Sequence, residues 1–196
     1  QREGVQAWLA MWAGDADEAR RHLQNEREQF AALDHTQGLR VALQHASWLE
    51  VATGDNGRGL SYAQEALRLG KDIGRTGTEP ALYSLIAIAN SLTGDVAAGQ
   101  AALRRALPVD QPSPPPEDAL WALRAAALIE RARGGGIPKL AGAATSIQAE
   151  TELMYPPLLE SWWMDATETT DIDGNANVEV GMFLARKVSR NAAHSD

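Results

Sequence analysis

Apolar residues recur every three or four positions along residues 1–154, with polar residues between them. Leu60, Ala63 and Leu67 give one example. This spacing places apolar side chains on one face of an α-helix, and no stretch alternates between apolar and polar residues for long enough to indicate a strand. The pattern predicts helices over residues 2–13, 16–33, 37–53, 58–73, 78–93, 96–107, 117–133 and 138–154.

A glycine turn recurs at a fixed spacing of 40 residues. The pair Gly-Asp begins at Gly14, Gly54 and Gly94, and a run of three glycines begins at Gly134. Glycine closes a helix because it adopts the left-handed conformation at little steric cost, and aspartate caps the free amides at the start of the next helix. The sequence therefore predicts four helix hairpins of about 40 residues each.

Small residues recur in the same register. Those seven positions before each turn glycine are Ala7, Ser47, Ala87 and Ala127. Those five or twelve positions after it are Ala19, Gly59, Gly99, Ala66 and Ala106, whereas the first repeat has Glu26 at the last of these positions. Small side chains at these places let two antiparallel helices approach closely.

Together, the turns and the small residues resemble the tetratricopeptide repeat over roughly residues 1–153. The repeat here is longer than the family's usual length of about 34 residues. The extra residues lie in the connections 71–79 and 108–117, and the family's large aromatic residues at its fourth and eleventh positions are mostly missing. The long form resembles the repeats of bacterial maltose-type transcription activators. The resemblance implies an all-α solenoid that binds a protein partner within a larger bacterial regulator of signal transduction and transcription.

After residue 154 the pattern changes. Pro156 and Pro157 precede an apolar segment that contains Trp162 and Trp163, which predicts a further helix over residues 155–168. A polar C-terminal extension follows over residues 169–196. The predicted organisation is thus a repeat domain over residues 1–154, one packing helix and a polar tail.

Charge and composition narrow the classes of partner. The formal net charge of -8 argues against direct binding of nucleic acid, which needs clustered Lys and Arg. The chain has no cysteine, so it has no disulfides or thiolate metal sites. No apolar run is long enough to span a bilayer, and we expect a cytoplasmic protein without a membrane partner. Because residue 1 is Gln and not Met, and the chain starts in what looks like a running helix, we also expect an excised fragment or a processed chain.

Chemistry-bearing residues form no constellation typical of an enzyme. The four histidines His22, His35, His45 and His194 show no metal-ligand spacing. The oxygen-rich segment 171–179 resembles the start of a calcium loop, but it has Ala176 and Met182 where such a loop needs glycine and glutamate. The glycine run at residues 134–136 is not followed by the Gly-Lys-Ser/Thr of a phosphate loop. We therefore predict no catalytic residue, no metal and no cofactor.

Large apolar residues occupy equivalent positions in the four repeats, at Trp8, Trp48, Ile88 and Leu128. In the tetratricopeptide family this position faces the concave groove, so the resemblance implies an apolar groove. Its predicted residues are Trp8, Trp12, Trp48, Val51, Ile88, Leu92 and Leu128, with Arg124 and Arg131 as a cationic end.

Two interpretations of these residues stay open. In the first, the residues are internal: they belong to the core, or they line a groove that the helix with Trp162 and Trp163 fills. In the second, they form a site for an external peptide, helix or neighbouring domain. A third possibility is a sensor for a small apolar or aromatic effector. A partner site should be open and elongated, whereas a sensor should have an enclosed pocket lined by tryptophan.

Overall fold

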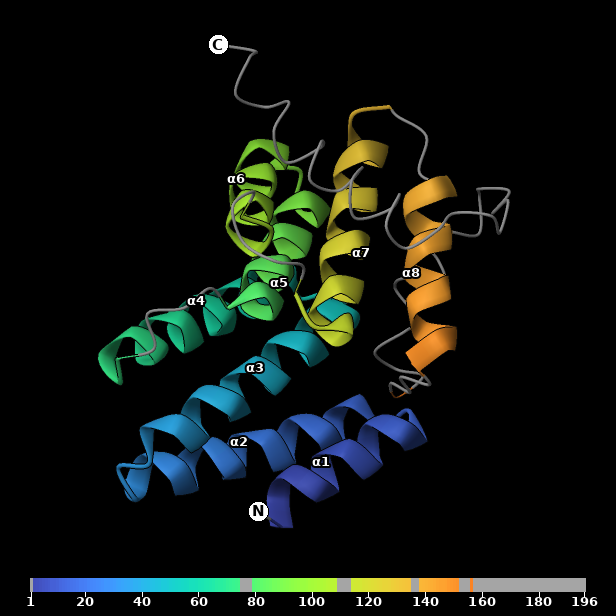
Figure 1. Cartoon of the computed structure of the whole chain (residues 1–196). Helices are drawn as coiled ribbons and strands as arrows, with labels where there is room; N and C mark the ends of the chain where they lie inside the picture. The colour runs from blue at the N-terminus through green and yellow to red at the C-terminus, as the bar shows by residue number, and fades with distance from the viewer. Residues whose placement is uncertain (1, 75–78, 109–113, 135–137, 152–155, 157–196) are drawn as a thin grey trace. The chain divides into compact units, whose positions relative to one another are not determined.

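The computed structural model describes residues 2–74, 79–108, 114–134, 138–151 and Pro156. Throughout these residues the regular structure is α-helical and contains no strand, as predicted (Figure 1). The described helices are α1 (Arg2–Ala13), α2 (Ala16–Ala32), α3 (Thr36–Ala52), α4 (Asn56–Asp72), α5 (Pro80–Leu92), α6 (Val96–Ala106), α7 (Pro116–Ala132) and α8 (Pro138–Thr151). The eight helices predicted between residues 2 and 154 are present, and their described ends differ from the prediction by less than one turn.

The repeated glycines end helices, which confirms the predicted hairpin turn. Each has a positive φ angle, with values of 79° at Gly14, 91° at Gly54, 90° at Gly94 and 75° at Gly134. The following aspartates cap the next helix, because each carboxylate accepts a hydrogen bond from the amide three residues later. The donors are the amides of Glu18, Arg58 and Ala98, at 3.0, 3.0 and 2.9 Å from Asp15, Asp55 and Asp95.

The helices form two compact units, which are divided between α4 and α5. In the N-terminal unit α1 pairs with α2 and α3 with α4, and α2 packs against α3 to join the two hairpins (Figure 1). In the C-terminal unit α5 pairs with α6 and α7 with α8, and both α5 and α6 pack against α7. Consecutive pairing of this kind is the arrangement expected of a helical-repeat protein.

The recurring small residues lie where the helices meet. Those that precede the turn glycines are fully buried, at 0% exposure for Ala7, Ser47, Ala87 and Ala127. Ala19, Ala66 and Ala106 are buried too, as are Gly59 and Gly99. The predicted close-contact positions are therefore confirmed.

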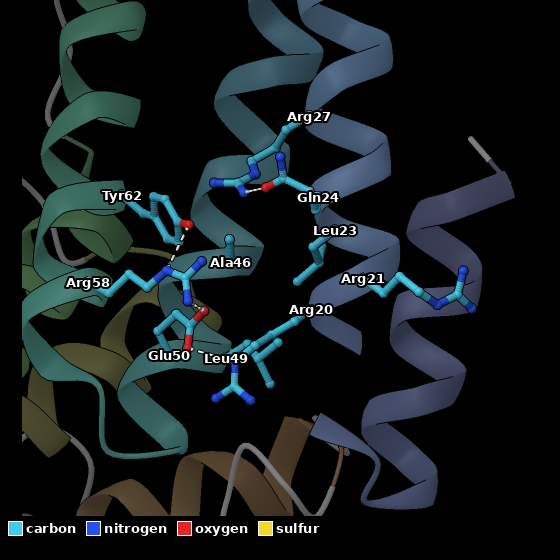
Figure 2. Close-up of a pocket in the computed structure, with 10 residues that line it drawn as sticks. All are labelled: Arg20, Arg21, Leu23, Gln24, Arg27, Ala46, Leu49, Glu50, Arg58 and Tyr62. Atoms are coloured by element: carbon cyan, nitrogen blue, oxygen red, sulfur yellow. Dashed lines mark hydrogen bonds and ion pairs between the residues drawn. The ribbon is translucent and has the colours of Figure 1, made fainter. Parts of the chain in front are cut away.

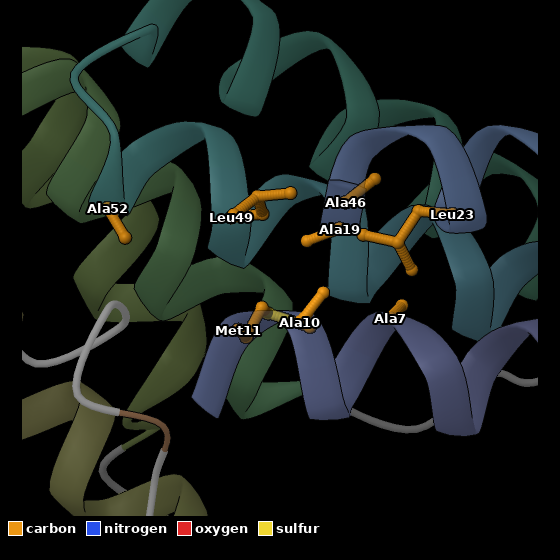
Figure 3. Packing of buried hydrophobic residues seen from close by; sticks show 8 residues of the cluster. All are labelled: Ala7, Ala10, Met11, Ala19, Leu23, Ala46, Leu49 and Ala52. Atoms are coloured by element: carbon orange, nitrogen blue, oxygen red, sulfur yellow. The ribbon is translucent and has the colours of Figure 1, made fainter. Parts of the chain in front are cut away.

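The core of the N-terminal unit consists mainly of alanine and leucine. Figure 3 shows Ala7, Ala10 and Met11 of α1, with Ala19 and Leu23 of α2 and Ala46, Leu49 and Ala52 of α3. Trp8, Ala16, Trp48 and Tyr62 are only partly buried and pack against this cluster. Burial of a leucine-sized side chain is worth about 1.5–3 kcal/mol, so apolar packing of this kind is the main source of stability in the unit.

Some predictions concern other parts of the chain. The predicted packing helix over residues 155–168, with Trp162 and Trp163, and the polar extension over residues 169–196 lie outside the described residues, apart from Pro156. Within the described part, none of the helices combines the length and the apolar character that crossing a bilayer requires.

Candidate functional site

An aromatic cluster joins α1 to α3 in the N-terminal unit. The ring centroid of Trp8 lies 5.5 Å from that of His45 and 6.3 Å from that of Trp48, and both contacts are edge to face. His45 and Trp48 lie one helical turn apart on α3, with centroids separated by 5.4 Å. Edge-to-face aromatic pairs contribute about 0.5–1.5 kcal/mol beyond the area they bury, so the cluster fixes the orientation of its rings.

His45 is the titratable member of this cluster. Its Nδ1 atom is buried and has no hydrogen-bond partner. Burial lowers the pKa of His45 to about 4, since the charged imidazolium is poorly solvated there. The ring is therefore neutral near pH 7, and it behaves as an aromatic surface more than as an acid or a base.

An exposed apolar stripe continues from the cluster along α1. Val5, Leu9 and Trp12 are 58%, 57% and 42% exposed. Their spacing of four and three residues places them on one face of the helix, next to the partly buried Trp8. Single exposed apolar residues are ordinary, but four neighbours on two helical turns form a patch suited to contact with another apolar surface.

The other predicted apolar groove residues divide into buried and exposed ones. Val51, Ile88 and Leu128 are buried, at 2%, 0% and 7% exposure. The prediction that these three residues line an open groove therefore does not hold, and they belong to the core instead. Trp8 and Trp48, at the equivalent positions, are only partly buried. Leu92, at 40% exposure, is accessible on α5 in the C-terminal unit.

The two arginines predicted to form a cationic end have different surroundings. Arg124 is fully buried, and its guanidinium carbon lies 5.3 Å from the ring centroid of Trp121. It therefore offers no charge to an open groove, contrary to the prediction. Arg131 is exposed near the end of α7.

A pocket that the sequence did not predict lies among α2, α3 and α4. Its volume is about 280 Å³. Its lining residues, drawn in Figure 2, are Arg20, Arg21, Leu23, Gln24, Arg27, Ala46, Leu49, Glu50, Arg58 and Tyr62. Four arginines and one glutamate thus surround a small apolar surface, in a chain whose overall charge is negative.

A buried carboxylate holds two of these arginines. Glu50, at 3% side-chain exposure, accepts a 3.0 Å hydrogen bond from Nε of Arg20 and forms a 3.5 Å ion pair with Nη1 of Arg58. Arg20 also donates to Thr53 and to Asp17, at 2.6 and 3.0 Å. The negative charge of Glu50 is thereby compensated by one arginine from each hairpin, and its ion pairs connect α2 to α4 through α3.

Tyr62 brings Arg58 together with a third arginine of the pocket, Arg27. The guanidinium carbons of Arg27 and Arg58 lie 4.4 and 5.7 Å from the centroid of its ring, and Nε of Arg58 donates a 3.0 Å hydrogen bond to its hydroxyl oxygen. Figure 2 shows both guanidinium groups turned toward Tyr62, whereas Arg21 extends away from them. The spacing of Arg58 and Tyr62 on one helix hinted at their contact, but pairs such as Arg20 with Glu50 join distant segments that no sequence pattern connected.

In the part of the chain that the structure covers, no group of three or more histidine and acidic side chains could hold a metal ion. The calcium-loop-like segment 171–179 lies outside the described residues.

No protein-family model matches this chain, and comparisons with curated proteins and with solved structures also give no match. The class of the protein therefore rests on its own fold, which is all-α with helices packed in consecutive pairs.

Proposed function

We propose that this chain is a tetratricopeptide-like binding module, and that it captures an apolar helical segment of a partner protein on α1 and α3. The observation that carries the proposal is the combination of the Trp8, His45 and Trp48 cluster with the exposed stripe Val5, Leu9 and Trp12. The stripe supplies accessible apolar area and the cluster supplies a rigid aromatic base. An amphipathic helix recognises such a surface through anchors spaced three and four residues apart.

Aromatic anchors dominate the energetics of protein interfaces, since they bury a large area at low cost in conformational entropy. Trp12 fits this role because it is accessible, whereas Trp8 and Trp48 are partly buried and pack against the core. The proposed activity is therefore binding and not catalysis. In line with the repeat pattern, we also propose that the module belongs to a larger cytoplasmic regulator of bacterial type.

Selection of helical peptides from a displayed library against the full chain tests this proposal. We expect selected peptides with apolar anchors at helical spacing to bind with micromolar affinity, which corresponds to about 8 kcal/mol. Trp12→Ala should weaken binding at least about tenfold. Leu33→Ala is the matched control, because Leu33 is also exposed but lies at the end of α2.

Peptides whose affinity is the same for the wild-type chain and for Trp12→Ala would contradict the proposal, since they would bind elsewhere. Failure to select any peptide with apolar anchors would contradict it as well. Thermal unfolding of each variant separates loss of binding from loss of folding.

A further inference from the structure

The arginine-lined pocket among α2, α3 and α4 has an imbalance of charge. Among the lining residues, Arg20, Arg27 and Arg58 face one carboxylate, Glu50, which pairs with Arg20 and Arg58. Arg20 also pairs with the exposed Asp17 outside the pocket lining. Arg27 pairs with no carboxylate of the described residues, and its Nε atom is buried without a hydrogen-bond partner. A buried donor that lacks an acceptor costs free energy, and an anion in the pocket would supply that acceptor.

The two arginines that contact Tyr62, Arg27 and Arg58, also favour an anion in the pocket. Arg27 and Arg58 come from different helices and are both held against one ring, so their like charges are brought together. Contact with the ring, and for Arg58 the ion pair with Glu50, offsets part of this repulsion. A negatively charged group between the two guanidinium groups would accept hydrogen bonds from both, and guanidinium groups match the oxygens of carboxylate and phosphate groups well.

The remaining walls of the pocket define the rest of the ligand. Leu23, Ala46 and Leu49 contribute an apolar surface beside the arginines. The volume of about 280 Å³ lies near the lower limit of pockets that hold small organic molecules. None of the tryptophans among the described residues lines this pocket, so its chemistry differs from that of the apolar or aromatic effector site considered from the sequence.

We infer that this pocket binds a small organic anion, in which a carboxylate or phosphate group contacts Arg27 and Arg58 and an apolar portion contacts Leu23, Ala46 and Leu49. The inference does not depend on the proposed partner surface, because the pocket and the aromatic cluster use different side chains. The ligand would also connect the two hairpins of the N-terminal unit, since Arg27 lies on α2 and Arg58 on α4.

Calorimetric titration of the full chain with four probes tests the inference. Benzoate and phenyl phosphate carry both the anion and the apolar portion, benzamide lacks the charge, and inorganic phosphate lacks the apolar portion. We expect at least one of the two organic anions to bind more tightly than benzamide and than inorganic phosphate. The stronger of the two then identifies the oxyanion.

Two charge-removing variants locate the binding. Arg27→Gln and Arg58→Gln should each weaken the organic anion about tenfold, which is the loss expected for one charge-assisted hydrogen bond. Arg68→Gln is the matched control, because Arg68 lies on α4 and pairs with Asp72 outside the pocket. If either pocket variant fails to fold, amide shift changes in the wild-type chain should instead map the bound anion to residues of α2, α3 and α4.

Equal binding of benzamide and benzoate would overturn the inference. So would the absence of binding by both organic anions at concentrations on the order of 10 mM, the weak limit for a specific site. Equal losses in Arg68→Gln and in the pocket variants would overturn it too, since they would show a general effect of charge.

Discussion

The hydroxyl group of Ser47 donates a 2.8 Å hydrogen bond to the carbonyl oxygen of Gly59. The two residues belong to opposite helices of one hairpin, α3 and α4, and both are buried. A Cβ atom at residue 59 would lie 2.7 Å from Cγ2 of Val51 and 3.2 Å from the carbonyl oxygen of Ser47. The hairpin is thus held together at a backbone separation that leaves no room for a side chain at this position.

Replacement of this glycine should therefore be unfavourable even though it lies within a helix. Gly59→Ala should lower the free energy of unfolding by about 1–2 kcal/mol, because the cost of overpacking exceeds the gain in helix propensity. Gly57→Ala is the control on the same helix, where a new Cβ has no neighbour within 4 Å. It should raise the free energy by up to about 1 kcal/mol. Urea unfolding measures both, and equal stabilisation by the two substitutions would show that the hairpin can relax.

Ala87, the third-repeat equivalent of Ser47, occupies a close-contact position of the same kind in the C-terminal unit. Ala87 on α5 is fully buried, whereas Ala101 on α6 is exposed. Ala87→Leu should destabilise the unit by about 1–3 kcal/mol, since a larger side chain forces neighbouring helices apart. Ala101→Leu should change stability by less than about 0.5 kcal/mol. Thermal unfolding that gives the same midpoint for both variants would contradict this assignment of the helix interface.

The fold could be predicted because its signals are local. A turn glycine such as Gly54 and a capping aspartate such as Asp55 act within a few residues, and their repetition fixes the boundaries of the helices. The candidate sites depend on non-local contacts. The register made Ile88 equivalent to Trp48, but periodicity alone could not reveal that the aliphatic residue is enclosed while the tryptophan is partly exposed. The ion pair of Arg20 with Glu50 likewise depends on how two hairpins stack.

Glu26 is the exception in the small-residue pattern, and its burial should lower the free energy of unfolding. It is 8% exposed, and its Oε2 atom is buried without a hydrogen-bond partner. Burial raises its pKa, so stability is lost as the pH rises through the normal range of a carboxyl group. Glu26→Gln should raise the free energy of unfolding at pH 7 by on the order of 1 kcal/mol, and this gain should vanish in acid.

A surface substitution on the same helix provides the comparison for this variant. Glu28→Gln removes the same charge at an exposed position and should leave the free energy of unfolding nearly unchanged. Urea unfolding at neutral and at acidic pH measures both variants. A gain from Glu26→Gln that persists in acid would contradict the proposed origin in carboxylate burial.

Trp8 and Trp12 should differ in what they contribute to stability. Trp8 packs against the core and contacts His45 and Trp48, so Trp8→Ala should cost about 3 kcal/mol or more. Trp12 is 42% exposed, and Trp12→Ala should cost less than about 1 kcal/mol. Chemical denaturation followed by circular dichroism measures both values. A cost for Trp12→Ala close to that for Trp8→Ala would show that Trp12 is structural and would weaken its role as an anchor.

His45 should make the stability of the N-terminal unit depend on pH. Its pKa is about 4 in the folded chain and near 6.5 when unfolded, so well above pH 6.5 His45 is neutral in both states and does not lower the stability. As the pH falls from about 6.5 to 4, the unfolded state takes up its proton first, and the free energy of unfolding should fall by up to about 3 kcal/mol. His45→Gln cannot take up this proton and should lose correspondingly less over the same range. Urea unfolding followed by tryptophan fluorescence measures the two pH profiles, and parallel profiles would mean that His45 is solvated in the folded state.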